Sequence, residues 1–407
     1  MMTVKPLRIL QLTPRCPYPL HDGGAIGMYN ITKYLSLRGH SIRMVSFSTE
    51  ENYYPPELTK YCSLRTVGAP TGHSVVKLIL SQFKGVPYMV LKYKNDPMQM
   101  ALQEEMDQFK PDVLHIDHFV MAQYGVNIRK SCKTPMVLRE HNFETKFLRR
   151  FAQQTSNPIK KLTLRMESRR MVQFEVATCE QFDRCAMITH EDEAELKSLS
   201  PKVKTTVIPA GVEIPPESEN NRASRTILFL ASLDWQPNVD GFFWFYREVL
   251  PLVVQMMGDA TVHIVGRGKS TRLSSLHDGR VKFIGFVDDV APYIRDAAVC
   301  IVPLHSGSGM RIKILEMMAQ GKAVVATSVG AEGIEVESGK DILIADSPQD
   351  FAGAVVQLLQ NHEYRDTIGA SARLRVRQKY DWSRVAERFE NVYYEVCASE
   401  AMSRSGG

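Results

Sequence analysis

The residues with the clearest chemical potential lie in a glycine-rich stretch of the second half of the chain. Residues 304–319 read LHSGSGMRIKILEMMA, in which two glycines precede a run with the spacing of an amphipathic helix. The first N–H groups of a helix have no partner within the helix, and glycine lets a ligand approach them closely. Arg311 and Lys313 add positive charge at the same point. This combination is typical of a phosphate-binding site.

Glu316 lies about one helical turn beyond these two cations. Its carboxylate can accept hydrogen bonds from the hydroxyls of a sugar while the helix amides hold a phosphate. The stretch therefore predicts a ligand that carries both groups. An ordinary turn between a strand and a helix, with a solvated glutamate, is the alternative that the local sequence leaves open.

The other glycine patterns exclude two familiar nucleotide-binding classes. Residues 265–270 read VGRGKS, the end of a P-loop, but His263 stands where that motif requires its first glycine. No G-x-G-x-x-G follows the first expected strand, so a nicotinamide dehydrogenase lacks its best signature. Gly23 and Gly24 instead precede a helix expected over 28–37. They predict either a flexible loop that closes over a ligand or a plain strand-to-helix loop.

Polar side chains also gather at the end of an expected strand in the first half. His115, Asp117 and His118 come at the end of residues 112–117. Open α/β sheets bind ligands at the carboxyl ends of their strands. These side chains therefore either contact a substrate or form a hydrogen-bond network within the loop.

The elements that position these residues are short apolar runs, each followed by a longer amphipathic segment. This alternation predicts parallel strands joined by crossover helices. It occurs twice, and residues 207–224, rich in proline and polar side chains, mark a hinge between two α/β domains. The expected strands are 8–13, 41–48, 112–117, 135–141 and 186–189 before the hinge, and 226–233, 261–266, 281–285, 299–304, 323–327 and 342–345 after it.

Length and composition agree with this organisation. A chain of 407 residues with 44% hydrophobic residues is too long for one ordinary core and is typical of a globular protein. No apolar run reaches the roughly 18 to 20 residues that span a bilayer, and the N-terminus lacks a signal-peptide pattern. The seven cysteines form no C-x-x-C pair, which favours reduced thiols over a disulfide or zinc framework. We expect a cytoplasmic protein.

The net charge of +5 is unevenly distributed. Residues 146–170 contain eight lysines or arginines and one acid, Glu167. Such a segment either faces an anionic partner or forms a solvated helix face. No zinc finger, RNP-type aromatic pattern or basic-zipper heptad accompanies it, so nucleic acid is not the expected partner.

Motifs along nearly the whole chain resemble the family four retaining glycosyltransferases of the GT-B fold. The resemblance rests on residues 17–24 and 38–40 in the first domain, the segment VIPAGVE at 207–213, LDWQPNVD at 233–240, GKAVV at 321–325 and YDWS at 380–383. It implies an α/β chain of two Rossmann-like domains whose parallel sheets face each other across a cleft. Residues 1–206 would bind the acceptor and residues 207–382 the nucleotide sugar, and a C-terminal helix at 383–400 would cross back to the first domain.

The resemblance also implies roles for donor-site residues. Glu316 matches the second glutamate of the family's donor helix, which binds the ribose of the nucleotide. Ser308 stands where the first glutamate, which contacts the donor sugar, is expected. Phe286 and Val287 match the segment that contacts the base. The other candidates for donor binding are Gly23, Gly24, Gly266, Gly309, Met310, Arg311 and Lys313.

The family's diphosphate clamp falls on uncharged residues of this chain. Ser232 and Asn238 stand where an arginine and a lysine are common. The charge of the leaving diphosphate must still be stabilised, and arginine binds phosphate in a bidentate way. We therefore expect Arg311 and Lys313 to do this catalytic work.

The resemblance adds one catalytic candidate in the first domain. His141 follows the strand 135–141 and matches the histidine that faces the reacting sugar. A histidine there can hydrogen-bond the sugar or the acceptor, and the adjacent Glu140 is expected to tune it. His115, Asp117 and His118 become candidates for acceptor binding.

These residues predict transfer of a sugar from a nucleoside-diphosphate sugar to a hydroxyl acceptor with retention of configuration. The resemblance is nearest to bacterial transferases of exopolysaccharide or cell-surface glycan synthesis. A glycan or lipid-linked sugar is the expected acceptor, and neither a metal nor a cofactor is expected. The basic residues 146–170, with 77–94, would rest the first domain on an anionic membrane at the inner face of the cell membrane. A non-catalytic partner that binds nucleotide sugars or glycans, and a nucleotide-sugar epimerase of the same fold, are the alternatives.

Overall fold

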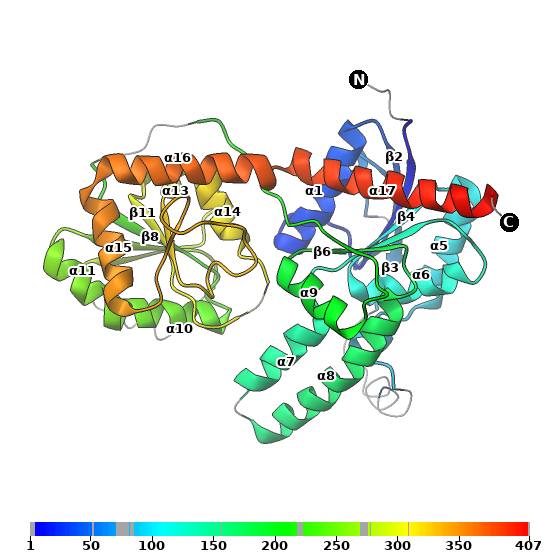
Figure 1. Ribbon diagram of the computed structural model, residues 1–407, viewed down its shortest axis with the longest axis horizontal. Helices are drawn as coiled ribbons and strands as arrows, with labels where there is room; N and C mark the ends of the chain where they lie inside the picture. The colour runs from blue at the N-terminus through cyan, green and yellow to red at the C-terminus, as the bar shows by residue number, and fades with distance from the viewer. Residues whose placement is uncertain are drawn as a thin grey trace. The chain divides into compact units, whose positions relative to one another are not determined.

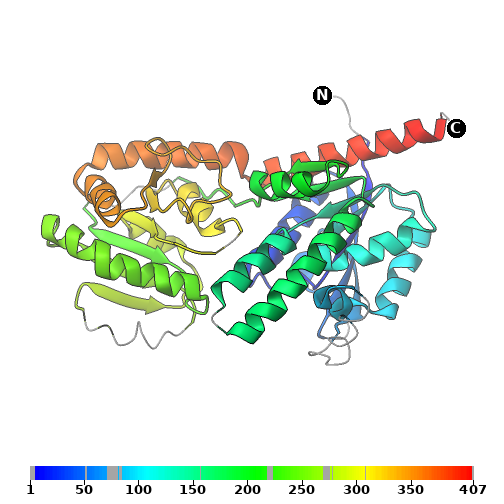
Figure 2. The ribbon, with the colours of Figure 1, turned by 60° about the horizontal axis from the view of Figure 1, so that its bottom comes forward.

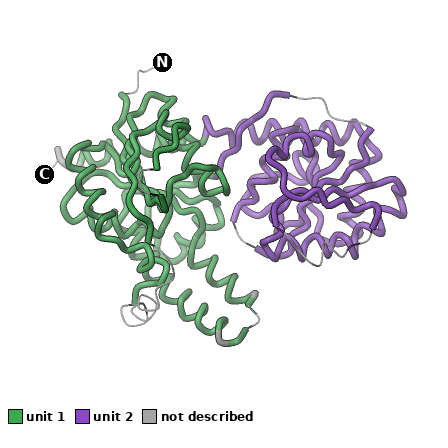
Figure 3. Tube along the Cα trace, turned by 180° about the vertical axis from the view of Figure 1, so that it is seen from behind, with its two compact units in different colours: residues 1–209, 385–407 green, residues 210–384 purple. Residues whose placement is uncertain are grey.

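The computed structural model of the protein contains two compact units (Figures 1 and 3). Unit 1 comprises residues 1–209 and 385–407, and unit 2 comprises residues 210–384. The residues that the structure describes are 5–50, 53–70, 81, 85–155, 157–217, 223–268, 276, 278–307 and 309–405. Within them, no helix is both long enough and apolar enough to cross a membrane.

Unit 1 contains a parallel sheet in the order β3-β2-β1-β4-β5-β6-β7, built from its described residues. The central strands are buried along their whole length because helices cover both faces of the sheet (Figure 1), as is usual for parallel sheets. The strands are β1 (Arg8–Thr13), β2 (Ser41–Ser48), β3 (Ser63–Gly68), β4 (Val113–Asp117), β5 (Met136–Arg139), β6 (Arg184–Met187) and β7 (Thr205–Val207).

The helices of unit 1 fill the crossovers between these strands. Two of them, α7 and α8, pack along each other as a hairpin between β5 and β6. The described helices are α1 (Gly23–Leu37), α2 (Pro56–Thr59), α4 (Tyr88–Tyr93), α5 (Asp96–Phe109), the 3-10 helix η1 (Phe119–Met121), α6 (Ala122–Arg129), α7 (Glu144–Gln154), α8 (Pro158–Cys179) and α9 (His190–Leu199).

The long C-terminal helix α17 (Trp382–Ser405) belongs to unit 1 from residue 385 onward. The carboxylate of Glu390 on this helix forms an ion pair with the guanidinium of Arg38, and its Oε1 lies 2.9 Å from Nε2 of His40. The hydroxyl of Tyr393 lies 2.5 Å from Nδ1 of His115 in β4. These polar contacts fix the helix against the sheet, as the expected return of the C-terminal helix requires.

Unit 2 repeats the architecture with a parallel sheet in the order β10-β9-β8-β11-β12-β13 among its described residues. The expectation of two α/β layers with parallel sheets is therefore confirmed. The strands are β8 (Thr226–Leu230), β9 (Thr261–Val265), β10 (Val281–Gly285), β11 (Val299–Val302), β12 (Val324–Ala326) and β13 (Leu343–Ile344). The helices are α10 (Gln236–Trp244), the π-helix η2 (Phe245–Val249), α11 (Leu250–Met256), α13 (Ala291–Asp296), α14 (Ile312–Ala319), α15 (Pro348–Gln360) and α16 (His362–Lys379).

Helix α16 fixes the C-terminal end of α14, the helix of the glycine-rich stretch. The guanidinium of Arg373 donates to the carbonyl oxygen of Ala319. Gly369 lets the backbone of α16 approach the turn after α14, because a Cβ at this position would lie 2.1 Å from the carbonyl oxygen of Gly321. The buried Lys322 donates to the carbonyl oxygens of residues 295 and 297 at 2.6 and 3.1 Å.

We predict that Gly369→Ala lowers the free energy of unfolding by about 1–3 kcal/mol, because the added methyl group would clash with backbone. The helix propensity of alanine, which favours the substitution by about 1 kcal/mol, is too small to compensate. Gly353→Ala, in the middle of α15, is the matched control. A Cβ there meets no atom within 4 Å, so this change should stabilise the protein by up to about 1 kcal/mol. Denaturant unfolding of both variants checks the opposite signs, and a Gly369→Ala protein as stable as the wild type would contradict the close packing.

Candidate active site

Both sheets reverse their strand order between the first strand and a strand that follows later in the chain. In unit 1 the reversal lies between β1 and β4, and in unit 2 between β8 and β11. The crossover helices leave in opposite directions at such a point, so a crevice opens beyond the carboxyl ends of the strands. The candidate residues of each unit lie at these ends.

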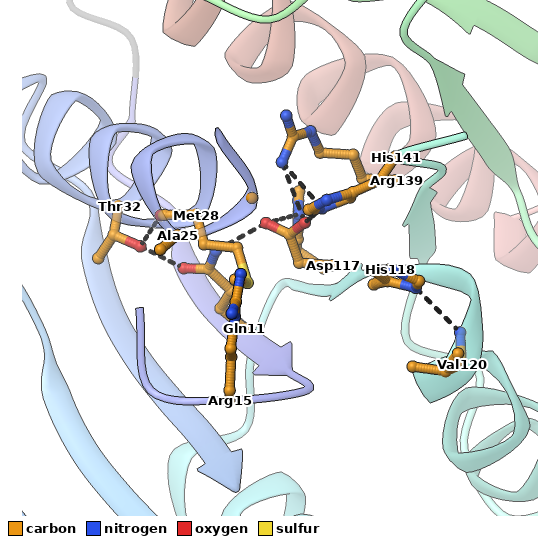
Figure 4. Close-up of polar contacts among 12 residues, drawn as sticks. Gln11, Arg15, Ala25, Met28, Thr32, Asp117, His118, Val120, Arg139 and His141 are labelled. Carbon is orange, nitrogen blue, oxygen red and sulfur yellow. Dashed lines mark hydrogen bonds and ion pairs between the residues drawn. The ribbon is translucent and has the colours of Figure 1, made fainter. Parts of the chain in front are cut away.

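In unit 1 the candidate site is built around the buried carboxylate of Asp117, the last residue of β4 (Figure 4). Its Oδ1 lies 3.1 Å from Nη1 of Arg139 and 2.5 Å from Nε2 of His141. Nε2 of Gln11, on β1, donates to Oδ2 at 3.4 Å. Burial opposes ionisation of Asp117, but Arg139 and then His141 outweigh it and hold the pKa of this carboxyl well below its usual range.

The tautomer of His141 follows from this contact. Nε2 of His141 has two neighbours, Oδ1 of Asp117 at 2.5 Å and Nη1 of Arg139 at 3.1 Å. An ionised Asp117 can only accept hydrogen bonds and makes the shorter contact, so we assign the proton to Nε2. The lone pair is then on Nδ1. Burial, and after it the charge of Arg139, lowers the pKa of His141, which keeps the ring neutral at pH 7. A Cβ on Gly24 would lie 3.5 Å from Nδ1, so the glycine leaves space in front of the nitrogen that can accept a hydrogen bond.

The buried side chain of Arg139 fits into the interior because the neighbouring Gly27 has no side chain. It is 2% exposed, and a Cβ on Gly27 of α1 would lie 3.0 Å from its Nη2. The three residues Asp117, Arg139 and His141 therefore form one preorganised unit, in which the cation, the anion and the imidazole fix one another.

Helix α1 begins at the diglycine pair, so the prediction of a loop ahead of a helix at 28–37 is wrong. Gly23 is the first residue of the helix. Asp22 caps it, because its Oδ1 accepts the N–H groups of two first-turn residues at 3.0 and 3.1 Å and also binds the guanidinium of Arg15. The cap supplies partners for amides that would otherwise have none, and the two glycines adopt helical geometry in the first turn.

The three acceptor candidates have different surroundings. His115 is 1% exposed and bound to Tyr393, and Asp117 is fully buried, so these two take part in a hydrogen-bond network, which is the second of the two roles that the sequence leaves open. His118 has a partly exposed side chain, and its ring centroid lies 4.8 Å from that of His141. Its φ of 97° is uncommon for a residue other than glycine and is the kind of strain found at functional sites. Burial, and then His141, lowers the pKa of His118 to about 3.

Glu140 does not tune His141, although the two residues are adjacent. Glu140 is 1% exposed, and its Oε1 accepts from the thiol of Cys179 at 3.4 Å. Burial, and after it the nearby Cys179, raises the pKa of this carboxyl well above its usual range. Consecutive side chains of an extended segment point to opposite faces, so the carboxylate partner of His141 comes from a neighbouring strand, as Asp117.

The start of α7 is fixed by an acid from α8. Glu175 accepts the N–H groups of Glu144 and Thr145 at 2.8 and 2.9 Å. The side chain of Glu144 is buried, and its Oε1 lies 4.0 Å from Nε2 of His118. Burial raises the pKa of Glu144 to about 7. Glu175 therefore fixes the end of the turn that connects His141 to α7.

In unit 2 the glycine-rich stretch forms the loop between β11 and α14. Gly307 and Gly309 have φ of 121° and 81°, a region that favours glycine. Arg311 is 6% exposed; its guanidinium lies 5.3 Å from the ring centroid of Trp235 and donates to the carbonyl oxygen of Gly309. A Cβ on Gly307 would lie 2.6 Å from the ring of Trp235 and 2.8 Å from Nη2 of Arg311. The glycine thus makes room for the stack of arginine on tryptophan.

Lys313 and Glu316 lie on the first turns of α14, and each is partly buried. Nζ of Lys313 donates to Oδ1 of Asn238 at 3.0 Å, and Asn238 in turn donates to the carbonyl oxygen of Ser232 at 2.7 Å. Burial, and then the charge of Arg311, lowers the pKa of Lys313 to about 7. Burial raises the pKa of Glu316, which the charge of Lys313 partly offsets. No described side chain caps α14, so its N-terminus retains the geometry that suits an anion.

The remaining donor candidates fall into three groups. Packing alone requires a glycine at position 266, because a Cβ there would lie 1.9 Å from the carbonyl oxygen of Ala231. Phe286, directly after β10, is 69% exposed, whereas Val287 and Met310 pack partly against the core. Ser308 lies outside the described residues.

A metal is not implied by the acids that follow β10. Oδ1 of Asp289 accepts the N–H of Ala291, the first residue of α13, at 2.9 Å, so this carboxylate takes part in the turn before the helix. Throughout the described part of the chain, no group of three or more histidine, cysteine or acidic residues is placed to hold a metal ion.

Two residues that the structure brings into these sites, Arg139 and Trp235, are not among the candidates that the sequence alone identifies. Arg139 carries a charge at the end of an otherwise apolar strand, a signal that could have identified it. In the sequence, Trp235 stands only as part of a motif and Asn238 only as an uncharged residue at a clamp position, because their partners Arg311 and Lys313 are more than 70 residues away. Such contacts depend on the tertiary fold.

Known proteins match this chain along most of its length. Residues 21–214 match the family model described as Glycosyltransferase Family 4, and residues 224–361 match the one described as Glycosyl transferases group 1. An uncharacterized 44.6 kDa protein in the cps region of Klebsiella pneumoniae is 22% identical over 405 residues, which are 95% of this chain and 99% of that protein. A phosphatidyl-myo-inositol mannosyltransferase of Mycobacterium leprae (strain TN) is 32% identical over 205 residues, which are 47% of this chain and 54% of the mannosyltransferase.

A solved structure shares the fold. The crystal structure of Anabaena HepE in complex with UDP-glucose matches with a TM-score of 0.63 at 14% identity, and covers 96% of this chain and 100% of that one. The two family models together span both units, each of which has the parallel Rossmann-like sheet described above. The chain belongs to the group 1 family of glycosyltransferases with the GT-B fold.

Proposed function

We propose that this protein is a retaining glycosyltransferase that moves a sugar from a nucleoside-diphosphate sugar to a hydroxyl acceptor. The observation that carries the proposal is the arrangement at the start of α14. There, Arg311 and Lys313 lie beside an uncapped helix N-terminus and one turn before Glu316, at the strand reversal of unit 2. Two cations and helix amides suit a diphosphate, and a carboxylate suits the hydroxyls of a ribose.

In the proposed reaction the bond between the anomeric carbon and the diphosphate oxygen breaks, and the acceptor oxygen bonds to the same face of that carbon. The proton of the acceptor hydroxyl passes to the leaving diphosphate, so no protein nucleophile is needed. Arg311 and Lys313 stabilise the two charges that develop on the leaving group. These side chains do the work that a metal does elsewhere, and the proposal includes no metal and no further cofactor.

Donor recognition is proposed to use Glu316 for the ribose and the exposed Phe286, with the backbone of Val287, for the base. Gly309 and Met310 border the diphosphate. The UDP-glucose bound to the similar HepE protein supports a nucleotide sugar as the donor. Ser308, in place of an acidic residue, leaves the contact to the sugar ring to other groups.

Unit 1 is proposed to bind the acceptor and to face the reacting sugar with His141. Its Nδ1 can accept a hydrogen bond from a sugar hydroxyl while Nε2 stays on Asp117. His118, which lies beside His141 and is partly exposed, is the remaining acceptor candidate at the end of β4. Gly24 keeps the space beside His141 open, and Gly23 precedes it at the start of α1.

We place the reaction in exopolysaccharide or cell-surface glycan synthesis, with a hexose as the transferred sugar and a glycan or lipid-linked sugar as the acceptor. The cps region that contains one relative, and the name of the other, a mannosyltransferase that acts on phosphatidyl-myo-inositol, support this choice. A cytoplasmic site of action is part of the proposal, and the seven free cysteines suit a reducing compartment.

The proposal is tested first by thermal shift against UDP-, GDP-, ADP- and TDP-sugars. A true donor binds the folded state and should raise the melting temperature as its concentration increases. The stabilising donor is then incubated with and without candidate glycan acceptors, and release of the nucleoside diphosphate and the configuration of the product are measured. Stabilisation without any turnover would favour a non-catalytic binder, and an epimerised donor would favour an epimerase.

We predict that Arg311→Gln lowers kcat/KM by roughly a hundredfold or more, because the leaving diphosphate loses a preorganised cation. Arg311→Lys keeps the charge but loses bidentate binding and the stack on Trp235, so it should restore only part of the activity. Arg280→Gln removes an exposed arginine of unit 2 and serves as the control. Full turnover in Arg311→Gln would place the diphosphate elsewhere.

We also predict that the protein takes up a proton when it binds a nucleoside diphosphate above pH 7. The pKa of Lys313 is lowered to about 7 in the free protein, so at pH 8 most of this side chain is neutral. A bound dianion favours the charged amine and raises the pKa toward its ordinary value of about 10.4. Titration calorimetry in buffers of different ionisation enthalpy measures this uptake at pH 8. It should disappear in Lys313→Met, and a binding heat that does not depend on the buffer in the wild type would argue against it.

His141→Ala is predicted to lower turnover by about a hundredfold with little loss of stability, because the side chain touches the reacting sugar but lies at the edge of the core. Asp117→Asn should lower both turnover and stability, the latter by roughly 3 kcal/mol, because it leaves the buried charge of Arg139 unpaired. The exposed His190 provides the control variant His190→Ala. If Asp117→Asn unfolded at the wild-type temperature, the network around Asp117 would not be as described. Unfolding curves and steady-state rates measure both effects.

A further inference from the structure

The hairpin of α7 and α8 projects from the body of unit 1, as Figures 1 and 2 show. Its helices pack along each other through buried side chains such as Leu148 and Ala152. A groove of about 280 Å³ runs along one side of the hairpin. It is lined by Arg149, Ala152, Gln153, Arg165, Ser168 and Arg169.

Part of the positive charge expected over 146–170 is neutralised within unit 1. Lys146 binds Asp192 at 2.7 Å, and Arg170 binds Glu167 at 3.3 Å. Glu167, the one acid of the segment, also accepts the N–H of residue 88. The other basic stretch expected at a membrane, 77–94, has residues 77–80 and 82–84 outside the described part of the chain.

Two arginines of the groove, Arg165 and Arg169, can bind an anion from solution. Arg165 and Arg169 are exposed and form no ion pair with any described residue, whereas Arg149 binds Glu195 at 2.8 Å and remains half exposed. The groove is therefore positively charged along its α8 side. An anion that enters it meets two unpaired guanidinium groups and the partly exposed Arg149.

Apolar side chains accompany these arginines on the same face of α8. Leu162 and Arg165, and Met166 and Arg169, are three residues apart. Leu162 and Met166, and Arg165 and Arg169, are four residues apart. The four side chains therefore form one stripe along the helix. Leu162 is 61% exposed and Met166 is 44% exposed. Phe147 is not part of this surface: it is two residues before Arg149 and so points to the opposite side of α7, about 200° away.

We propose that this stripe, with the arginine groove, docks unit 1 on a membrane that contains anionic phospholipids. The guanidinium groups bind headgroup phosphates, and the two apolar side chains enter the boundary with the acyl chains. Exposed apolar side chains beside cations suit a membrane surface, where the apolar groups enter the boundary with the acyl chains and the cations attract anionic headgroups, whereas a nucleic-acid groove needs no exposed leucine. This partner goes beyond the proposed sugar transfer, and it would bind whether or not a sugar is transferred.

The test is co-sedimentation of the full-length protein with vesicles of phosphatidylcholine alone or with about 30% phosphatidylglycerol, without any sugar donor. The wild type should bind only the anionic vesicles and dissociate as salt is raised. Arg165→Gln with Arg169→Gln should weaken binding by roughly tenfold to a hundredfold. Leu162→Ser with Met166→Ser should weaken it as well, by removing the apolar contact.

Lys60→Gln with Lys133→Gln is the matched control, because it removes two exposed cations from elsewhere on unit 1. It should bind the anionic vesicles like the wild type. Equal melting temperatures of all variants establish that the fold is intact, since the stripe is exposed. Binding that is equal for both kinds of vesicle, or that the arginine double variant retains in full, would overturn the proposal. So would a double variant that loses affinity for an RNA homopolymer while its affinity for vesicles is unchanged.

Discussion

The reversal of strand order within each parallel sheet is the constraint on which both candidate sites depend. Right-handed crossovers place the helices that follow β1 and β4 on different sides, and the carboxyl ends of the strands at such a point are where open α/β sheets bind ligands. The same holds for β8 and β11. In unit 1 this position collects Gln11, Asp117 and the start of α1. In unit 2 it collects the loop of Trp235 and the glycine-rich stretch. Neither site needs a special fold, only different side chains at an equivalent opening.

Charged groups at these openings are buried, which costs stability unless each charge has a partner. Asp117 and Arg139 satisfy each other, and the missing side chain of Gly27 gives the arginine its space. The result is a fixed histidine with a defined tautomer, which a solvated surface network would not provide. In unit 2 the C-terminal end of α14 is held by α16, so the cations at its other end are carried on a helix that cannot shift freely. Stability elsewhere in the fold thus offsets the polar groups concentrated at the sites.

The sequence predicts the repeated strands and the donor loop because apolar runs and glycines act locally. It misses β3 and β7: β3 is only partly buried and carries an arginine within its run, and β7 has three residues. Pairings between distant residues are a different matter. Adjacency predicts Glu140 as the partner of His141, but side chains alternate along an extended segment, so Glu140 lies in the core against Cys179. The partner of His141 is Asp117, on the neighbouring strand β4. Gly23 and Gly24 predict a loop because glycine disfavours helices, but Asp22 caps the first turn and α1 begins at Gly23.

The pair Asn238 and Lys313 shows how an uncharged side chain can orient a lysine. A lysine or arginine at this position would have no acceptor for the amine of Lys313 and would bring a like charge close to it. Asparagine instead offers an acceptor that orients the amine, and its own amide is fixed by the carbonyl of Ser232. Arg311 is oriented in a different way, by the face of Trp235 and by the space that Gly307 leaves. The asparagine, the tryptophan and the glycine therefore orient the two cations at the start of α14 as one linked set.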